Sequence, residues 1–495
     1  MLGTAESYQQ PRIGRLDRPR ISGLLPIVAL SVATTIILES SRLGFTLALA
    51  SAVVLFAAAL PGYRLLTGSF DLVEPAVYFL AYFCVDVIAN LWYDLTVGSR
   101  LFNVGPQTLD AVPMVEVALS TVVLGLGAFY FGYSRRHARV LALRVPALPE
   151  EWDETRATVV LAMLAMSSVC VWGLMIYFGG GLFLWISEAK DQLLLGEHSG
   201  GIYSSLMAWE LPALALSIVI IGGRLGMLRG VRSLMYPFFA LAGLFGVFTG
   251  SRGWLPRLIL AAFVASYTTS TSRSHWRSIR LVALGTAPLI VVIVLLFKAV
   301  TIIRFAGIGG ATITQVSESM DDTSLIKVLA ARFQALESLV WTESNVPRFY
   351  PYTLGYEFLD IPFMIVPRVI WPDKPESRDS VKISAAGTLG MEDPNWRDTY
   401  GYDINLLARL YLDGGVAVVI LGMAITGFVF RFIYEYLALR PNPSGALVLS
   451  VVFPYFTGFA DSDFYGLLTF GCVIFGIAIV VCATICKPRG RTSWT

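Results

Sequence analysis

Long apolar runs recur along the whole chain, and they restrict its possible folds more than any other feature. A run of about 17 to 25 apolar residues crosses roughly 30 Å of hydrocarbon as one α-helix. Twelve such runs lie near 22–39, 43–60, 73–91, 111–133, 157–178, 202–222, 235–250, 254–270, 281–303, 416–437, 445–460 and 464–486. We therefore predict an all-α integral membrane protein with about twelve transmembrane helices.

The composition agrees with this fold class. Hydrophobic residues make up 56% of the 495 positions, only 15% are charged, and the mean hydropathy is +0.67, so the bilayer is the expected solvent. The net charge is +2, and the basic residues form small dispersed groups, which argues against a nucleic-acid partner.

Basic residues gather in alternate connections between the runs. One side holds segments such as "SRRHARVLALR", "RLGMLRGVR" and "SRSHWRSIR", whereas the short loops of the other side hold only Arg42, Arg100, Lys190 and Arg252. Because cytoplasmic loops are enriched in Lys and Arg, we predict that both termini are cytoplasmic.

Residues 304–415 form the one long connection, and the alternation puts them on the outer face. Long loops without structure of their own are uncommon unless they are functional. We therefore divide the chain into a first bundle of about nine spans (1–303), a large extracytoplasmic loop that carries the active region (304–415), and about three further spans (416–495).

The stretch "SLIKVLAARFQALESLVW" in this loop has helical periodicity and predicts an amphipathic helix. Arg332 falls in the middle of its apolar face, while Lys327, Gln334 and Ser338 form a polar side that we expect to be solvated. Two interpretations of Arg332 stay open, namely a snorkelling or locally paired side chain and an arginine directed at a buried anion.

A proline-rich turn, "FMIVPRVIWPDKPESRDS", lies further along the loop. Its prolines fix the backbone and so hold Arg368, Trp371 and Lys374 at set places. "TGSRGWLPR" offers a second anion site, because Arg252 stands where a helix N-terminus faces outward and Arg257 lies slightly deeper.

Further polar groups are expected on the same face. They are Lys298 and Arg304 at the end of the ninth run, and Tyr400 and Arg409 around "TYGYDINLLA". The planar fork of arginine donates two parallel hydrogen bonds to phosphate, so we predict a pocket for a lipid-linked phosphate or diphosphate. A structural role at the membrane interface is the alternative for each of them.

Acidic residues inside the runs are costly in hydrocarbon and are either functional or paired with Arg257 or Lys298. They are Glu74, Asp86, Glu116 and Glu210. Glu337 on the loop helix is the favoured general base, and the further candidates are Asp360, Asp398, Asp403, Asp461 and Asp463. The three histidines and five cysteines show no metal-binding spacing, so we predict neither a metal nor a cofactor.

The order of these features resembles the Wzy-type polymerases of bacterial O-antigen and exopolysaccharide repeat units. The resemblance covers about residues 240–440 and rests on "GSRG", then "VPRVIWPDKP" in the external loop, then "DINLLARLYLDGGVAVVILG" entering the next span. It implies a metal-independent glycosyltransferase of the GT-C type in the bacterial inner membrane, with its active face in the periplasm.

The resemblance also implies an undecaprenyl-diphosphate-linked glycan as both donor and acceptor, membrane lipid as surroundings, and a chain-length regulator and a flippase as further partners. Within that mechanism we expect Arg252, Arg332, Arg368 and Arg409 to stabilise the departing diphosphate and Glu337 to take the acceptor proton. Arg257, Lys298, Arg304, Trp371, Lys374 and Tyr400 are expected to bind substrate.

Two alternatives remain. An O-antigen ligase has a related architecture but uses a histidine in its external loop, and residues 304–415 contain none. A transporter or flippase for lipid-linked sugars would use the intramembrane acids as a path, but the sequence shows no internal repeat and gives such a protein no reason for a long outer loop.

Overall fold

The computed structural model is described here over ten segments. They are residues 42–67, 70–96, 111–178, 206–248, 254–269, 335–348, 351–359, 405–440, 442–458 and 464–487, with Val366 and Trp371 as single positions. Over these residues the protein is helical, with one isolated β-bridge between Trp152 and Cys486 as the only pairing of extended backbone there. The all-α prediction is confirmed for this part of the chain.

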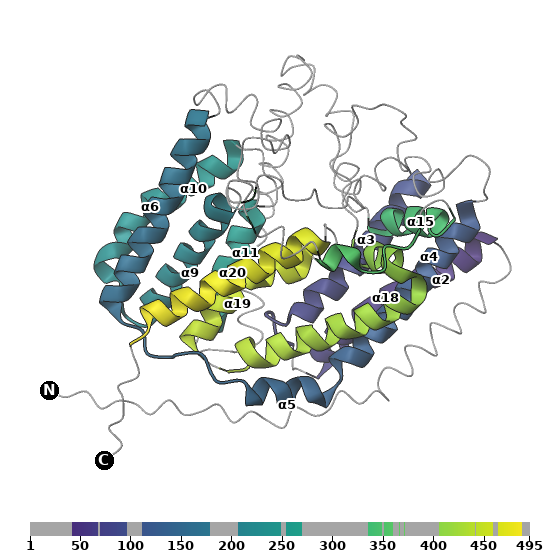
Figure 1. Ribbon diagram of the computed structural model, residues 1–495. Coiled ribbons are helices and arrows are strands. Elements are labelled where there is room, and N and C mark those ends of the chain that lie inside the picture. The colour runs from purple at the N-terminus through teal and green to yellow at the C-terminus, as the bar shows by residue number, and fades with distance from the viewer. Residues whose placement is uncertain are drawn as a thin grey trace.

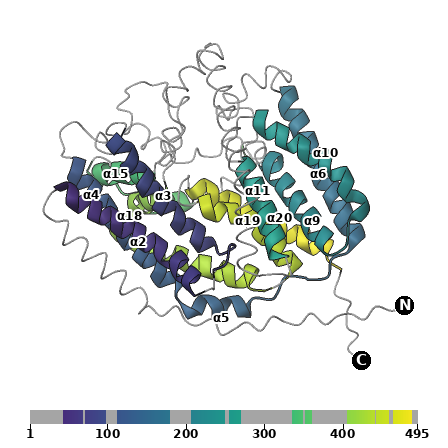
Figure 2. The ribbon, with the colours of Figure 1, turned by 180° about the vertical axis from the view of Figure 1, so that it is seen from behind.

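The helices form two groups, which Figures 1 and 2 show from opposite sides. The first group contains α2 (Arg42–Leu66), α3 (Pro75–Thr96), α4 (Ala111–Tyr133), α15 (Ala335–Asn345) and α18 (Leu406–Ile433). The second contains α6 (Glu154–Phe178), α9 (Leu211–Arg224), α10 (Arg229–Phe248), α11 (Trp254–Thr268) and α20 (Phe464–Ile485). Helix α19 (Pro443–Gly458) packs against α9, α11 and α20 on one side and against α3 on the other, and so joins the groups.

The core of the first group is built where α4 crosses α18. Phe79, Phe129 and Phe430 are fully buried there, and the rings of Phe79 and Phe129 stack with centroids 5.0 Å apart. Gly132 and Gly427 let the two backbones touch, because a Cβ on either would overlap a carbonyl oxygen of the facing helix. Small residues at a crossing are the usual way in which membrane helices pack closely.

Three of the described helical stretches are long and apolar enough to cross a membrane, namely Pro113–Tyr133, Glu154–Tyr177 and Leu406–Ala438. Shorter apolar helices accompany them. Their outer faces carry exposed large apolar side chains, including Phe131, Met166 and Leu174, as expected of surfaces that contact lipid. A membrane protein is thus supported, whereas the total of twelve spans stays a prediction because the runs at 22–39 and 281–303 lie outside the described residues.

The two ends of the first group differ in character. Helix α5 (Arg136–Arg144) runs across one end, as Figure 1 shows, and exposes basic side chains there. Arg440 fastens it by donating a hydrogen bond of 3.0 Å to the carbonyl oxygen of Val145. The opposite end of the group carries α15 (Figure 1). We call these the α5 end and the α15 end.

Helix α18 begins ten residues before the predicted run at 416–437 and bends at Gly414 and Gly415. Gly415 has φ of +69°, which favours glycine. Just before the bend, the carbonyl oxygen of Asp413 accepts from the backbone N–H of Leu354, and its carboxylate accepts from that of Gly355 at 3.2 Å. The bend therefore holds the 351–359 segment, which includes the 3₁₀ turn η4 (Tyr356–Leu359), against α18.

Candidate functional site

Helix α15 is enclosed by protein rather than lying on a wet surface. It packs against α3, α4 and α18, and nearly every residue from Ala335 to Asn345 is buried. Ser338, predicted to lie on a solvated side, is 2% exposed and donates a hydrogen bond of 3.0 Å to the carbonyl oxygen of Ala335. That part of the prediction is wrong, because a tertiary contact covers the polar side of the helix. Lys327 and Gln334 lie outside the described residues.

The N-terminus of α15 is capped by an acid from the apolar helix α3. The two carboxylate oxygens of Asp86 on α3 accept the backbone N–H groups of Ala335 and Leu336, each at 3.0 Å. A carboxylate at this position satisfies otherwise unpaired donors and is stabilised by the helix dipole. This gives the intramembrane acid Asp86 a structural role.

The N-terminus of α18 meets the same spot. Asn405 caps α18 by accepting the N–H of Ala408 at 2.8 Å, and its amide nitrogen also donates to the carbonyl oxygen of Ala335. Two helix N-termini, both of which favour negative charge, therefore converge at the α15 end.

Arg409 and Glu337 lie one turn or less beyond this junction. Arg409 is in the first turn of α18 and Glu337 is in the first turn of α15, and both side chains are buried. Arg409 was expected in the loop before a span, and the structure instead includes it in the helix. Of the expected catalytic residues, these are the two that the described part of the chain contains, and they come from helices in direct contact.

A second charged cluster belongs to the other helix group. Arg257 on α11 forms an ion pair of 3.5 Å with Glu210, which ends the π-helical turn η3 (Leu206–Glu210), and its guanidinium carbon lies 5.4 Å from the ring centroid of Tyr455. The alternative in which an intramembrane acid pairs with Arg257 is confirmed for Glu210. The side chain of Arg257 is still 38% exposed, and its role in substrate binding stays a prediction.

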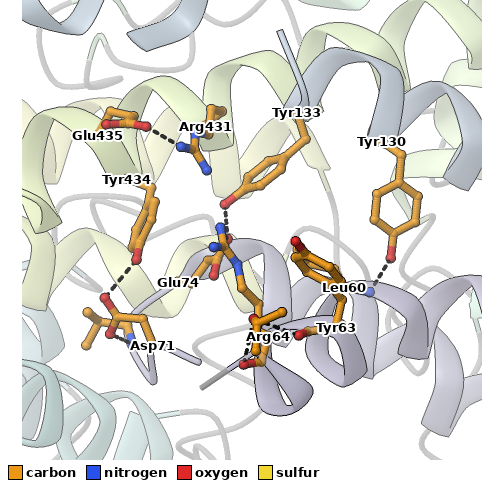
Figure 3. Close-up of polar contacts among 12 residues, drawn as sticks. Leu60, Tyr63, Arg64, Asp71, Glu74, Tyr130, Tyr133, Arg431, Tyr434 and Glu435 are labelled. Carbon is orange, nitrogen blue, oxygen red and sulfur yellow. Dashed lines mark hydrogen bonds and ion pairs between the residues drawn. The ribbon is translucent and has the colours of Figure 1, made fainter. Parts of the chain in front are cut away.

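A third cluster is buried at the α5 end, and Figure 3 shows its contacts. Nη2 of Arg64 on α2 lies 3.1 Å from Oε1 of Glu74, which also accepts from the hydroxyl of Tyr133. Arg431 pairs with Glu435 one turn later, at the junction with the π-helical turn η6 (Tyr434–Ala438). Arg64 lies in the last turn of α2.

Each charged side chain of this cluster at the α5 end has a partner within it. Arg64 has Glu74, Arg431 has Glu435, and the hydroxyl of Tyr434 donates to Asp71 at 2.7 Å (Figure 3). The contacts tie α2, α3, α4 and α18 together, and the cluster lies at the end of the group opposite α15. We therefore assign it a structural role.

Alanine at Glu74 is expected to destabilise the protein by about 3 to 5 kcal/mol, because the buried Arg64 would lose its carboxylate. Thermal unfolding of the purified protein in detergent would measure this loss. The double variant Glu74→Leu with Arg64→Met removes both charges and should recover most of it. Equal stability of the Glu74→Ala variant and the wild type would contradict the structural role.

Of the remaining site residues predicted from the sequence, one lies within the described residues. Trp371 is described and is 37% exposed. The others lie outside the described residues, namely Arg252, Lys298, Arg304, Arg332, Arg368, Lys374 and Tyr400. Whether they join Arg409 stays a prediction.

One partly buried acid at the α15 end, whose carboxylate oxygens are enclosed by protein, was not singled out from the sequence. Glu343 lies on α15, six positions after Glu337, and burial raises the pKa of its carboxyl to about 7. Its sequence signal was weak, because an acid near a helix end in a presumed external loop reads as an ordinary solvated charge. Only the packing of α15 shows otherwise.

Comparison with known proteins supplies one family. The family model for "O-antigen polysaccharide polymerase Wzy" matches residues 233–489, slightly more than half of the chain. The matched segment includes α10, α11, α15, α18, α19 and α20. No curated protein and no solved structure matches.

Proposed function

Because the chain belongs to the Wzy family of O-antigen polysaccharide polymerases, we propose that it joins undecaprenyl-diphosphate-linked repeat units into a polysaccharide. The growing chain leaves its lipid diphosphate and is transferred to the non-reducing sugar of a fresh lipid-linked unit. In this proposal the protein is a metal-independent glycosyltransferase of the GT-C type that works with a flippase and a chain-length regulator.

We place this reaction at the α15 end, on the periplasmic face of the inner membrane. Support comes from the α5 end, where Arg135, Arg136, Arg139 and Arg144 are exposed, because exposed basic groups are typical of the cytoplasmic side. The α15 end then faces the periplasm, where lipid-linked units would be presented.

The observation that carries the proposal is the position of Arg409. It is buried beside two converging helix N-termini, which favour negative charge and one of which already holds the carboxylate of Asp86. As the glycosidic bond breaks, negative charge grows on the diphosphate, and fixed guanidinium groups stabilise that charge more strongly than they stabilise the ground state. Arg252, Arg332 and Arg368 would join Arg409 in binding the diphosphate. Lys374, Arg304 and Tyr400 would also contact the substrate.

The decisive experiment supplies synthetic undecaprenyl-diphosphate-linked repeat units to proteoliposomes that contain the purified protein. Products separated on a gel should form a ladder with steps of one repeat unit, without any ion gradient. Substrate that crosses the bilayer without growing would indicate a transporter instead. Transfer only to an added lipid A core, with no ladder in its absence, would indicate a ligase.

A further inference from the structure

Glu343 differs from the buried acids of the described chain, because it is only partly buried yet its carboxylate oxygens are enclosed. Its side chain is mostly enclosed, and neither carboxylate oxygen has a hydrogen bond of good geometry. Thr121 on α4 is the polar side chain that faces it. The next residue, Ser344, is by contrast fully engaged, donating to the carbonyl oxygen of Val340 at 2.6 Å and contacting the sulfur of Met114 at 2.9 Å.

The buried acids in the described residues have partners. Glu74 pairs with Arg64, Glu210 with Arg257, and Asp86 with the N-terminus of α15. An unpaired carboxylate in a dry environment costs several kcal/mol, so a protein that retains one usually uses it. Glu343 therefore requires a functional explanation that its contacts do not provide.

One tyrosine of α18 lies near Glu343, and a second tyrosine lies near the first. Tyr411 lies within electrostatic range of the carboxylate, and Tyr352 lies within range of Tyr411. The hydroxyl of Tyr352 in turn reaches the bend of α18 at Gly415. The titratable or charged side chains on the elements near this end of α15 include Asp86 on α3, Glu116 on α4, Arg409, Tyr411 and Asp413 on α18, and Tyr352 in the 351–359 segment.

Most of the charged side chains near Glu343 form hydrogen bonds with other residues. Glu116 accepts from Thr46, Asp413 holds Thr353 and Gly355, and Asp86 caps the far end of α15. The carboxylate of Glu343 can thus take or give a proton without breaking a described ion pair. A carboxyl with a pKa near neutral pH is suited to general base catalysis, since a substantial fraction is ionised and the ionised form accepts a proton readily.

We propose that Glu343 is the general base of the polymerisation, an inference that rests on the proposed function. The acceptor hydroxyl oxygen attacks the anomeric carbon of the donor, and a new C–O bond forms. The bond from that carbon to the diphosphate oxygen breaks, and its electron pair stays on the diphosphate. The hydroxyl proton passes to the Glu343 carboxylate, which later releases it to water.

The test is the pH dependence of polymerisation in proteoliposomes with synthetic lipid-linked units. For the wild type, kcat/KM should rise about tenfold per pH unit up to about pH 7 and then level off, because the ionised form of Glu343 is active. Glu343→Gln should lower kcat by about 10² to 10⁴ and abolish the rise, with little change in KM. Glu343→Asp, which keeps the carboxylate, should retain the rise at a reduced rate.

Matched variants separate this role from a structural one. Glu116→Gln, on the neighbouring helix α4, should keep the wild-type pH profile. Glu337→Gln tests the sequence-based choice of base, and the inference is overturned if that variant, and not Glu343→Gln, removes the rise. A wild-type rate that is flat between pH 5 and 8 overturns it as well, even if Glu343→Gln fails to fold.

The two proposals fail in different ways. A wild-type protein that makes no ladder overturns the proposed function and this inference together. A wild type that polymerises while Glu343→Gln keeps its rate within about threefold overturns the inference alone, and a second carboxylate would then have to be sought among residues outside the described segments.

Discussion

Leucine at Gly132 is expected to prevent the protein from accumulating in the membrane. A Cβ at this position would overlap the carbonyl oxygen of Ala424 and lie 3.0 Å from the backbone nitrogen of Phe428, so α4 and α18 would have to separate. These atoms are backbone and cannot rotate away. We expect a loss of more than about 4 kcal/mol, at the upper end of the range for single substitutions.

The matched control is leucine at Gly127, five residues earlier on the same helix, where a Cβ meets no atom within 4 Å. Yield of folded protein after detergent extraction and the thermal midpoint in detergent would compare the two. Gly427→Leu should behave like Gly132→Leu, because it faces Phe129 across the same crossing. A Gly132→Leu protein as stable as the Gly127→Leu protein would disprove the close packing of α4 and α18.

Alanine at Arg252 and Arg368 together is expected to abolish polymerisation while the protein stays inserted and folded. Removal of one group that stabilises a developing negative charge typically lowers kcat by about 10² to 10³, so two losses should bring the ladder below detection. The single variants Arg332→Ala and Arg409→Ala should each lower kcat by the factor for one group, about 10² to 10³. Radiolabelled lipid-linked units in proteoliposomes would provide the necessary sensitivity.

The control for this series is Arg136→Ala, which removes an exposed arginine of α5 at the opposite end of the first helix group. Its rate should match the wild type, and all variants should keep the wild-type elution profile and thermal midpoint. If the Arg252 and Arg368 double variant polymerises at the normal rate, the proposal that these arginines stabilise the departing diphosphate is wrong.

The sequence was most informative where hydrocarbon thickness alone determines a helix. The run at 111–133 coincides with α4, and the run at 157–178 falls within α6 (Glu154–Phe178), because a membrane helix must be apolar over a fixed length. The pairing of an intramembrane acid with Arg257 could also be anticipated, since an isolated charge in lipid needs a partner.

The parts that could not be predicted depend on contacts between distant segments. Ser338 is buried because α15 is inserted among three helices. The residue that caps α15, Asp86, is 249 positions away from Ala335 in the sequence. Periodicity reports one helix at a time and cannot show this. The same limit hid Glu343, whose unusual environment is created by α4 and α18 and not by its sequence neighbours.

The site residues were identified by chemistry rather than by position. Arg409 was selected because arginine suits phosphate, and the structure adds that it lies in a helix whose N-terminus meets that of α15. Where the remaining basic residues approach a substrate depends on segments outside those described.

The bridge between Trp152 and Cys486 has a consequence for how the protein is made. The indole nitrogen of Trp152 donates to Ser444, which is 292 positions away, and the backbone N–H of Lys487 donates to Glu151 beyond the end of α20. Trp152 and Glu151 are synthesised long before Ser444 and Lys487, so α6 forms before the segments that these residues contact. These contacts can thus form only after α20 has been synthesised, and a chain that stops before α20 would leave the start of α6 without them.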